Sequence, residues 1–188
     1  MFDFNKQLEI GKQGETLVKN YYEAQKDEEG SKLYIVRDAR PEEQARGADF
    51  FIINNRLGFR YVEVKTDTQA QDTGNVALEI QIVQDNGTKQ AGCQFKTFSD
   101  FMFYWIYPSN ELLYWQPNEL LPYLIDWIME DKYRIVDAQN KNFFSRNLIV
   151  PIDAMRATGL VRSVYVSATL LEEAVSGKEV KPNTASKV

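Results

Sequence analysis

Two short apolar runs on either side of a turn constrain the fold of this chain more than any other feature. The runs are residues 50–53 and 59–65, and the segment between them is rich in residues that tolerate turn geometry. We predict a β-hairpin with its turn centred near Arg56. In an antiparallel pair with that centre, Asp49 lies directly opposite Glu63.

This register brings charged side chains together. Side chains alternate along a strand, so Glu63 and Lys65 share one face of it, and Val62 and Val64 share the other. Directly opposed residues have Cβ atoms ~5 Å apart. Two carboxylates at that separation repel each other, and a divalent cation is the usual compensation. The register therefore predicts a metal site at Asp49 and Glu63.

Composition narrows the chemistry further. The chain of 188 residues contains no histidine, and Cys93 is its single cysteine. Catalytic triads with histidine, zinc sites built on histidine or cysteine clusters, and an internal disulfide are therefore excluded. Catalysis must rest on carboxylates, lysine, tyrosine or a metal bound by oxygen. A lone cysteine fits a reducing cytoplasm, and no apolar run approaches the ~20 residues of a membrane span, so we expect a cytoplasmic protein without a membrane partner.

The domain organisation is simple. A hydrophobic content of 44% suits one well-filled domain, which we place at residues 1–175, and we expect the polar residues 176–188 to form a disordered tail. We predict an α/β fold with a central mixed β-sheet flanked by α-helices and a C-terminal α+β extension. The pattern predicts helices over 8–24, 118–131 (with Asn118 as N-cap) and 152–157, and strands over 33–36, 76–83, 93–97, 101–107, 112–115, 133–136 and 148–150.

The apolar stripe of the first predicted helix contains a carboxylate. Leu8, Gly11, Glu15, Val18 and Tyr22 fall on this stripe, and Gly11 leaves room for close approach of the helix to its neighbour. An unpaired carboxylate is unfavourable in such a place. A position at the rim, a buried pair with an arginine and a functional role each explain Glu15.

The order of these elements resembles the PD-(D/E)XK nuclease superfamily, which includes restriction endonucleases and archaeal Holliday-junction resolvases. The similarity lies mainly in residues 11–65, where a helix carrying Glu15 and a strand precede the hairpin with Asp49 and Glu63-Val64-Lys65. Ala48 replaces the proline that leads the motif. The resemblance implies a restriction-endonuclease-like core. The segment after Trp115 carries no motif that we can assign.

The resemblance also implies an activity. It predicts a Mg²⁺-dependent endonuclease, with Mn²⁺ able to substitute, that hydrolyses DNA phosphodiester bonds by metal-activated water. Asp49, Glu63 and the backbone carbonyl of Val64 would ligate the metal. Glu15 would complete the metal shell directly or through water, and Lys65 would orient or help deprotonate the attacking water. Many such nucleases cut as dimers, so a homodimer is an expected assembly.

Weaker candidates surround this set. Lys12, Lys19 and Arg46 are candidates for phosphate contacts, although surface lysines usually do nothing specific. Glu79 is a candidate for a further acidic role, and a solvated strand face explains it equally well. The aromatic run 101–107 lacks interleaved basic residues, which favours a buried core strand over a base-stacking surface.

Three other interpretations stay open. Asp49, Glu63 and Lys65 would also form an ordinary cross-strand ion-pair cluster, worth about a few tenths of a kcal/mol. A catalytically inactive nuclease-like module would bind nucleic acid without cleaving it. An acidic protein-interaction domain would fit the net charge of −5, which has the wrong sign for coating nucleic acid by bulk electrostatics.

Overall fold

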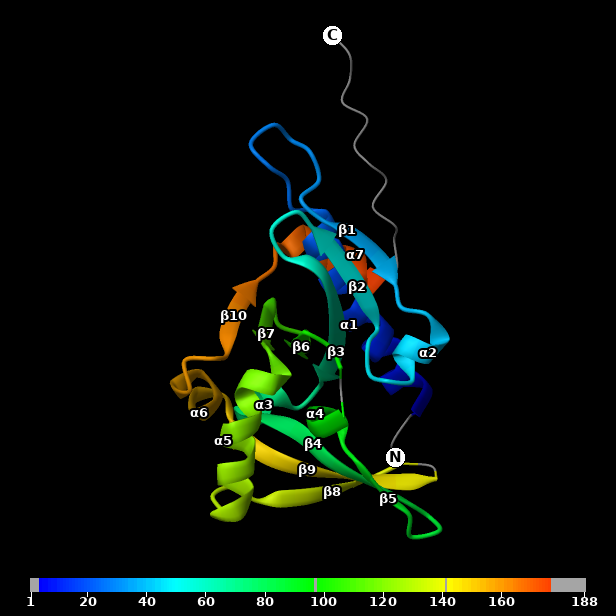
Figure 1. Cartoon of the computed structure of the whole chain (residues 1–188), viewed down its shortest axis with the longest axis vertical. Coiled ribbons are helices and arrows are strands. Elements are labelled where there is room, and N and C mark those ends of the chain that lie inside the picture. Colours follow the sequence, from blue (N-terminus) through cyan, green and yellow to red (C-terminus); the bar gives the residue numbers. More distant parts are fainter. Residues whose placement is uncertain (1–3, 97, 141, 177–188) are drawn as a thin grey trace.

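A mixed β-sheet forms the centre of the molecule (Figure 1). The structure is a computed structural model that describes residues 4–96, 98–140 and 142–176, and this sheet has six strands within them. Its order is β1-β2-β3-β6-β7-β10, and neighbouring strands are antiparallel except for β3 and β6, which are parallel. The strands are β1 (Ile35–Asp38), β2 (Phe50–Asn54), β3 (Gly58–Asp67), β6 (Phe101–Ile106), β7 (Glu111–Trp115) and β10 (Arg162–Tyr165).

A second, antiparallel sheet has the order β5-β4-β9-β8 in the described residues and lies beside the first (Figure 1). The parallel pair of β3 and β6 requires a crossover connection, and strands β4 and β5 lie within that connection. The crossover therefore ties the two sheets together. The strands of the second sheet are β4 (Asn75–Gln84), β5 (Lys89–Ala91), β8 (Ile135–Gln139) and β9 (Phe143–Pro151).

Helices cover both faces of the central sheet. Side chains of α1 and α7 share a core with one face, and α5 and the second sheet share a core with the other. The predicted α/β class, with a mixed central sheet flanked by helices, is thus confirmed. The helices are α1 (Phe4–Glu23), α2 (Pro41–Gln44), α3 (Ala70–Thr73), α4 (Cys93–Lys96), α5 (Pro117–Met129), α6 (Ile152–Ala157) and α7 (Ala168–Ser176). None of the helices in these residues has the length and apolar character needed to cross a bilayer.

Strand β6 shows how the central sheet separates the two cores. Phe103 and Trp105 belong to the core under α1, whereas Met102 and Tyr104 belong to the core shared with the second sheet. A strand that is buried on both faces reads as a nearly continuous apolar run. The prediction of a core strand, rather than a base-stacking surface, is confirmed.

The hairpin has the predicted register. Phe50 pairs with Val62 and Asn54 pairs with Gly58, which centres the turn on Arg56. The paired residues end at Phe50 and Val62, so Asp49 and Glu63 are the residues next to the last pair, and the Asp49 amide donates a hydrogen bond of 2.8 Å to the Val62 carbonyl.

Several predicted elements differ from the structure. Cys93 begins the helix α4, so the strand predicted over 93–97 is wrong. Gln116, not Asn118, is the N-cap of α5, because Pro117 takes the first helical position, for which its fixed φ is suited. A register shift between Glu79 and Gln81 moves the apolar alternation of β4 by one residue, so Val83 is buried and Ile82 is half-buried. The expected tail over 176–188 lies outside the described residues, except for its first residue.

Candidate functional site

Asp49 lies at the entrance to strand β2, and the backbone of β3 holds its side chain. The Val64 amide donates a hydrogen bond of 2.6 Å to Asp49 Oδ2. Burial and then the neighbouring charge of Glu63 raise the pKa of Asp49 to about 7, against the lowering effect of the Val64 amide. Asp49 is therefore a carboxyl group whose surroundings do not balance its charge.

Glu63 is the second carboxylate of the pair, and it is only 5% exposed. Its Oε1 lies 2.5 Å from the Lys65 ammonium nitrogen. Burial lowers the pKa of Lys65, but the charge and hydrogen bond of Glu63, with smaller contributions from Cys93 and Asp49, raise it overall. Lys65 is thus protonated at neutral pH, which favours the orienting and charge-balancing role over the deprotonation of water.

Helix α1 approaches this site at Gly14. A Cβ atom on Gly14 would lie 2.1 Å from Thr66 Oγ1, so only glycine allows the helix to lie this close to β3. A Cβ on Gly11 would meet nothing within 4 Å, and the prediction that Gly11 provides the close approach is wrong. The apolar stripe predicted from the sequence does not include Gly14. The sheet beneath a helix sets how the helix is rotated about its axis, and the sequence of the helix alone does not show this rotation.

Glu15 follows this contact and is half-buried. Burial raises its pKa, Lys19 and Lys12 oppose the rise, and Asp38 and Glu63 add to it. Glu15 also raises the pKa of Asp49. Its charge therefore acts on both carboxylates of the pair, as expected for a carboxylate within electrostatic reach of the site.

The donor set limits which metal the site would accept. Within the residues that the structure describes, no three or more Asp, Glu, Cys or His side chains are placed to hold a metal ion together. Glu15 is thus not gathered with Asp49 and Glu63 into a three-carboxylate set. Two carboxylates and the Val64 carbonyl are hard oxygen donors, which fit Mg²⁺ because this ion usually keeps several waters and uses few protein ligands.

The weaker candidates have other partners in the structure. Glu79 Oε1 accepts a hydrogen bond of 3.0 Å from the Cys93 amide at the start of α4. Lys19 forms an ion pair of 2.5 Å with Asp38. Lys12 is exposed on α1, and Arg46 is exposed before β2. Of these residues, only Lys12 and Lys19 act on the charge of a central candidate, namely Glu15.

Glu43 and Cys93 lie near the site but were not expected there. Glu43 accepts hydrogen bonds from the Arg40 amide at 2.7 Å, the Arg40 guanidinium at 2.8 Å and the Tyr61 hydroxyl at 2.8 Å. The sequence does carry one signal for it, a glutamate three residues after the N-cap residue Arg40 of α2. Cys93 is buried, burial raises its pKa to about 12, and Lys65 opposes the rise. No sequence pattern points to that neighbour.

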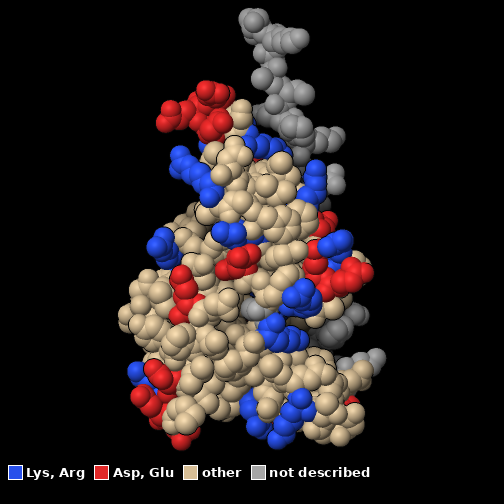
Figure 2. Space-filling view, in the orientation of Figure 1, with Lys and Arg blue, Asp and Glu red and all other residues tan. Residues whose placement is uncertain are grey.

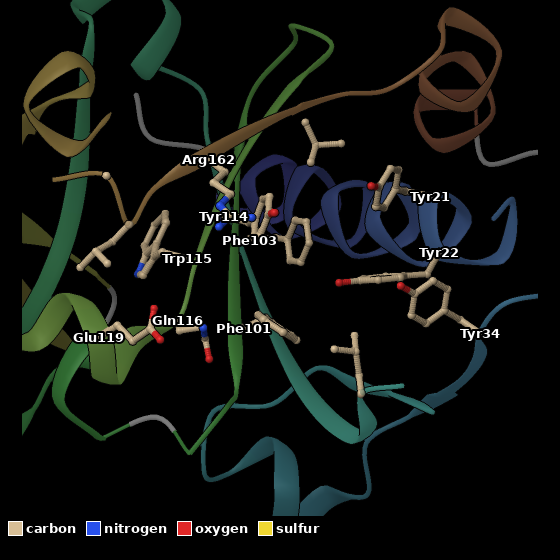
Figure 3. Close-up of a pocket in the computed structure, with 14 residues that line it drawn as sticks. Tyr21, Tyr22, Tyr34, Phe101, Phe103, Tyr114, Trp115, Gln116, Glu119 and Arg162 are labelled. Carbon is tan, nitrogen blue, oxygen red and sulfur yellow. The ribbon is translucent and has the colours of Figure 1, made fainter. Parts of the chain in front are cut away.

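The aromatic cavity of Figure 3 is separate from this site. It has a volume of about 350 Å³ and lies between α1 and the β6–β7–β10 side of the central sheet. Figure 3 shows Tyr22 and Tyr34 on one side of it, with Phe103 and Arg162 across from them. Asp49, Glu63 and Lys65 are not among its lining residues. The candidate site is therefore a charged cluster on the hairpin that does not open into this cavity.

Charge on the surface is mixed. Figure 2 shows basic and acidic side chains interspersed over the visible face, with an acidic group at the tip. This tip is the loop between α1 and β1, which contains Asp27, Glu28 and Glu29. Part of the negative net charge is therefore concentrated on this loop, beyond the C-terminal end of α1.

No family model, no curated protein and no solved structure matches this chain.

Proposed function

We propose that this protein is a Mg²⁺-dependent endonuclease that hydrolyses DNA phosphodiester bonds. The observation that carries the proposal is the pair of neighbouring carboxylates, Asp49 and Glu63, in which burial and mutual repulsion raise the pKa of Asp49 to about 7. A divalent cation bound between such carboxylates would remove the repulsion and return Asp49 to its ionised form. Without that cation the pair lowers the stability of the folded chain at neutral pH.

The arrangement of elements supports the proposal. The resemblance to PD-(D/E)XK nucleases rests on a helix, a strand and a hairpin in that order, and the chain folds these residues as α1, β1, β2 and β3. Asp49 and Glu63 are the residues next to the terminal Phe50–Val62 pair of the hairpin, and Lys65 lies two residues beyond Glu63 on the same face of β3. The acids and the lysine therefore have the order and spacing that the resemblance requires.

Each side chain has a chemical task in this proposal. A bound Mg²⁺ would supply Lewis acidity to the scissile phosphate and lower the pKa of a bound water. Asp49, Glu63 and the Val64 carbonyl would hold it. Lys65 remains protonated beside Glu63, so it offers positive charge to the phosphate oxygens as negative charge develops on them. Glu15 adds negative charge next to the pair, which strengthens its attraction for a cation.

The proposal is tested by cleavage of plasmid, branched and single-stranded DNA with Mg²⁺, with Mn²⁺ and with a chelator. We expect metal-dependent cleavage that Asp49→Asn reduces by at least about 100-fold, because the substitution removes a charged metal ligand. Glu42→Gln is the matched control, since Glu42 is an exposed carboxylate on α2 and its loss should leave the rate unchanged. Absence of cleavage with either metal on every DNA form would refute the proposal, as would cleavage by Asp49→Asn at the wild-type rate.

A second candidate is a catalytically inactive nuclease-like module that binds DNA. It is favoured by the lack, among the described residues, of a three-carboxylate group placed for a metal. Isothermal titration calorimetry distinguishes the two candidates. Mg²⁺ or Mn²⁺ binding that Asp49→Asn abolishes supports the nuclease, and heat-silent titrations with intact DNA binding support the inactive module.

A further inference from the structure

Four aromatic rings form a continuous strip on the outer face of the hairpin. We call Phe51, Phe59, Tyr61 and Phe98 the aromatic strip. Phe51 stacks on Phe59 with ring centroids 4.5 Å apart, Phe59 meets Tyr61 edge-on at 4.7 Å, and Tyr61 meets Phe98 at 4.4 Å. The strip therefore runs across β2 and β3 and on to the residues that precede β6.

Phe59 is the exposed ring of the strip, and Phe51, Tyr61 and Phe98 are half-buried. The opposite face of β2 and β3 is buried against α1, whereas Phe59 is 41% exposed and its partner Ile53 is 38% exposed. Ile35 on β1 extends the same face and is 53% exposed. A contiguous set of exposed apolar side chains on one sheet face is typical of an interaction surface.

The strip leads directly to the candidate site. Phe59, Tyr61, Glu63 and Lys65 are alternate residues of β3, so they share one face of the strand. Two residues of a strand span about 7 Å, which places Tyr61 one such step from Glu63. The strip therefore leads along β3 towards the Asp49–Glu63 pair, in which Glu63 is buried and Asp49 is half-buried.

Two arginines give the strip a positive edge. The Arg46 guanidinium lies 4.1 Å from the centroid of the Phe98 ring, and Arg37 pairs with Phe51 across β1 and β2. In the part of the chain that the structure describes, neither arginine forms an ion pair, and both are exposed.

Two of the carboxylates that border the strip, Glu43 and Asp100, already have hydrogen-bond or ion-pair partners. Glu43 accepts hydrogen bonds from Arg40 and Tyr61, and Asp100 accepts one from the Tyr61 amide and lies 3.8 Å from Arg60. Glu42 on α2 is exposed. Because Glu43 and Asp100 have these partners, the guanidinium groups of Arg37 and Arg46 remain available to an anionic ligand.

We propose that the aromatic strip binds the unpaired bases of a DNA strand, so that the substrate is DNA with a single-stranded segment, such as a flap or a tail. This inference rests on the proposed function. Exposed aromatic rings with neighbouring arginines bind single strands by stacking on their bases, largely without regard to sequence. Bases within a duplex are stacked on each other and do not offer their faces, which makes the strip selective for unpaired DNA.

The experiment measures DNA binding without cleavage. Fluorescence anisotropy in a chelating buffer compares labelled oligothymidylate with a duplex of the same length, using the full chain. We expect the single strand to bind more tightly, and Phe59→Ala to weaken that binding between about 5- and 150-fold while leaving duplex binding unchanged. Phe59→Trp should retain single-strand binding, because the larger ring still stacks.

Ile53→Ala is the matched control. Ile53 pairs with Phe59 on the same face and has nearly the same exposure, but it has no ring. If Ile53→Ala and Phe59→Ala weaken binding equally, the surface acts through general apolar contact and the stacking proposal fails. Equal affinity for duplex and single strand also overturns it. The strip could instead bind a second copy of the chain, and sedimentation in the same buffer detects this. If the wild type is a dimer and Phe59→Ala is a monomer with unchanged DNA binding, the strip is a dimer interface and the proposal is overturned.

Failure of this proposal is distinguishable from failure of the nuclease. Metal-dependent cleavage with no effect of Phe59→Ala on single-strand affinity keeps the nuclease and rejects the strip. Single-strand binding that depends on Phe59, with no cleavage by the wild type, keeps the strip and rejects the nuclease.

Discussion

Two carboxylates only six residues apart, Glu43 and Asp49, have opposite electrostatic surroundings. Glu43 accepts hydrogen bonds from the Arg40 side chain and amide and from Tyr61, and these bonds lower its pKa to about 2. Burial and the charge of Glu63 raise the pKa of Asp49 to about 7. Both lie beside β3, yet the fold compensates the charge of one and leaves that of the other uncompensated.

The difference separates a structural carboxylate from a candidate ligand. Glu43 fastens α2 to Tyr61 on β3 and so fixes the segment that leads to Asp49. Its oxygens are already engaged by donors of the chain. Asp49 has one hydrogen bond from Val64 and faces other carboxylates, so a cation would improve its surroundings. A carboxyl group whose pKa is strongly raised is a candidate functional residue, whereas a pKa lowered by hydrogen bonds within the fold fits a structural role.

The largest expected effect is on the pH dependence of stability without metal. The pKa of Asp49 rises from 3.8 to about 7 on folding, so its contribution is fully present below pH 3.8 and is lost as the pH rises through 7. Asp49→Asn should therefore raise the free energy of unfolding above pH 7, by a few kcal/mol. Thermal unfolding followed by circular dichroism in a chelating buffer measures this.

Glu43→Gln should change the pH dependence of stability in the opposite direction. The pKa of Glu43 falls from 4.5 to about 2 on folding, so its stabilising contribution is present above pH 4.5 and is lost as the pH falls through 2. The substitution should lower the Tm at neutral pH and remove this loss in acid. Parallel pH profiles for the two variants would contradict the contrast between the two carboxylates.

The hairpin and its carboxylate pair were predictable because they depend on local information. A short turn fixes the register, and this register brings Asp49 and Glu63 to the positions next to the Phe50–Val62 pair. The parallel pairing of β3 with β6 depends on a crossover of more than thirty residues, and the pattern predicted the strands without their order.

The parts that the sequence did not predict depend on contacts between distant segments. Glu43 is bound by Tyr61 from another element, and no local pattern encodes that hydrogen bond. Helix α4 forms where the sequence predicted an extended segment. Gly92 lies against the backbone of Glu79, where a Cβ would come within 2.3 Å of the Glu79 carbonyl oxygen. In this position the Glu79 carboxylate accepts a hydrogen bond from the Cys93 amide at the start of α4. Tertiary contacts decide short elements of this kind.

Addition of Mg²⁺ should stabilise the folded chain through Asp49 and not through Glu43. Above pH 7, Mg²⁺ at one hundred times its Kd should stabilise the wild type by about 2.7 kcal/mol, or a Tm increase of roughly 5–10 °C for a chain of this size. Asp49→Asn should lose most of this increase and Glu43→Gln should keep it. Differential scanning calorimetry with and without Mg²⁺ provides the measurement, and an equal increase in both variants would show that the ion binds elsewhere.

The position of α1 offers a smaller effect. Gly14→Ala places a Cβ against Thr66 and should destabilise the fold by about 1–3 kcal/mol through overpacking. Gly11→Ala meets no atom and should be neutral, or stabilising by about 0.5–1 kcal/mol, because alanine favours a helix. Urea unfolding of the two variants tests this. Equal destabilisation of both would mean that the close approach of α1 to β3 does not depend on Gly14.

The smallest effect is expected at Lys19. Its ion pair with Asp38 is largely exposed on the Asp38 side, and such pairs contribute about 0–1 kcal/mol, so Lys19→Ala should leave the urea midpoint almost unchanged. Lys19 also lowers the pKa of Glu15, so its removal should raise that pKa further. If Glu15 serves the site, the acidic limb of the cleavage rate moves to higher pH in Lys19→Ala while stability does not change. An unaltered limb would place Glu15 with Glu43, among the carboxylates that only support the fold.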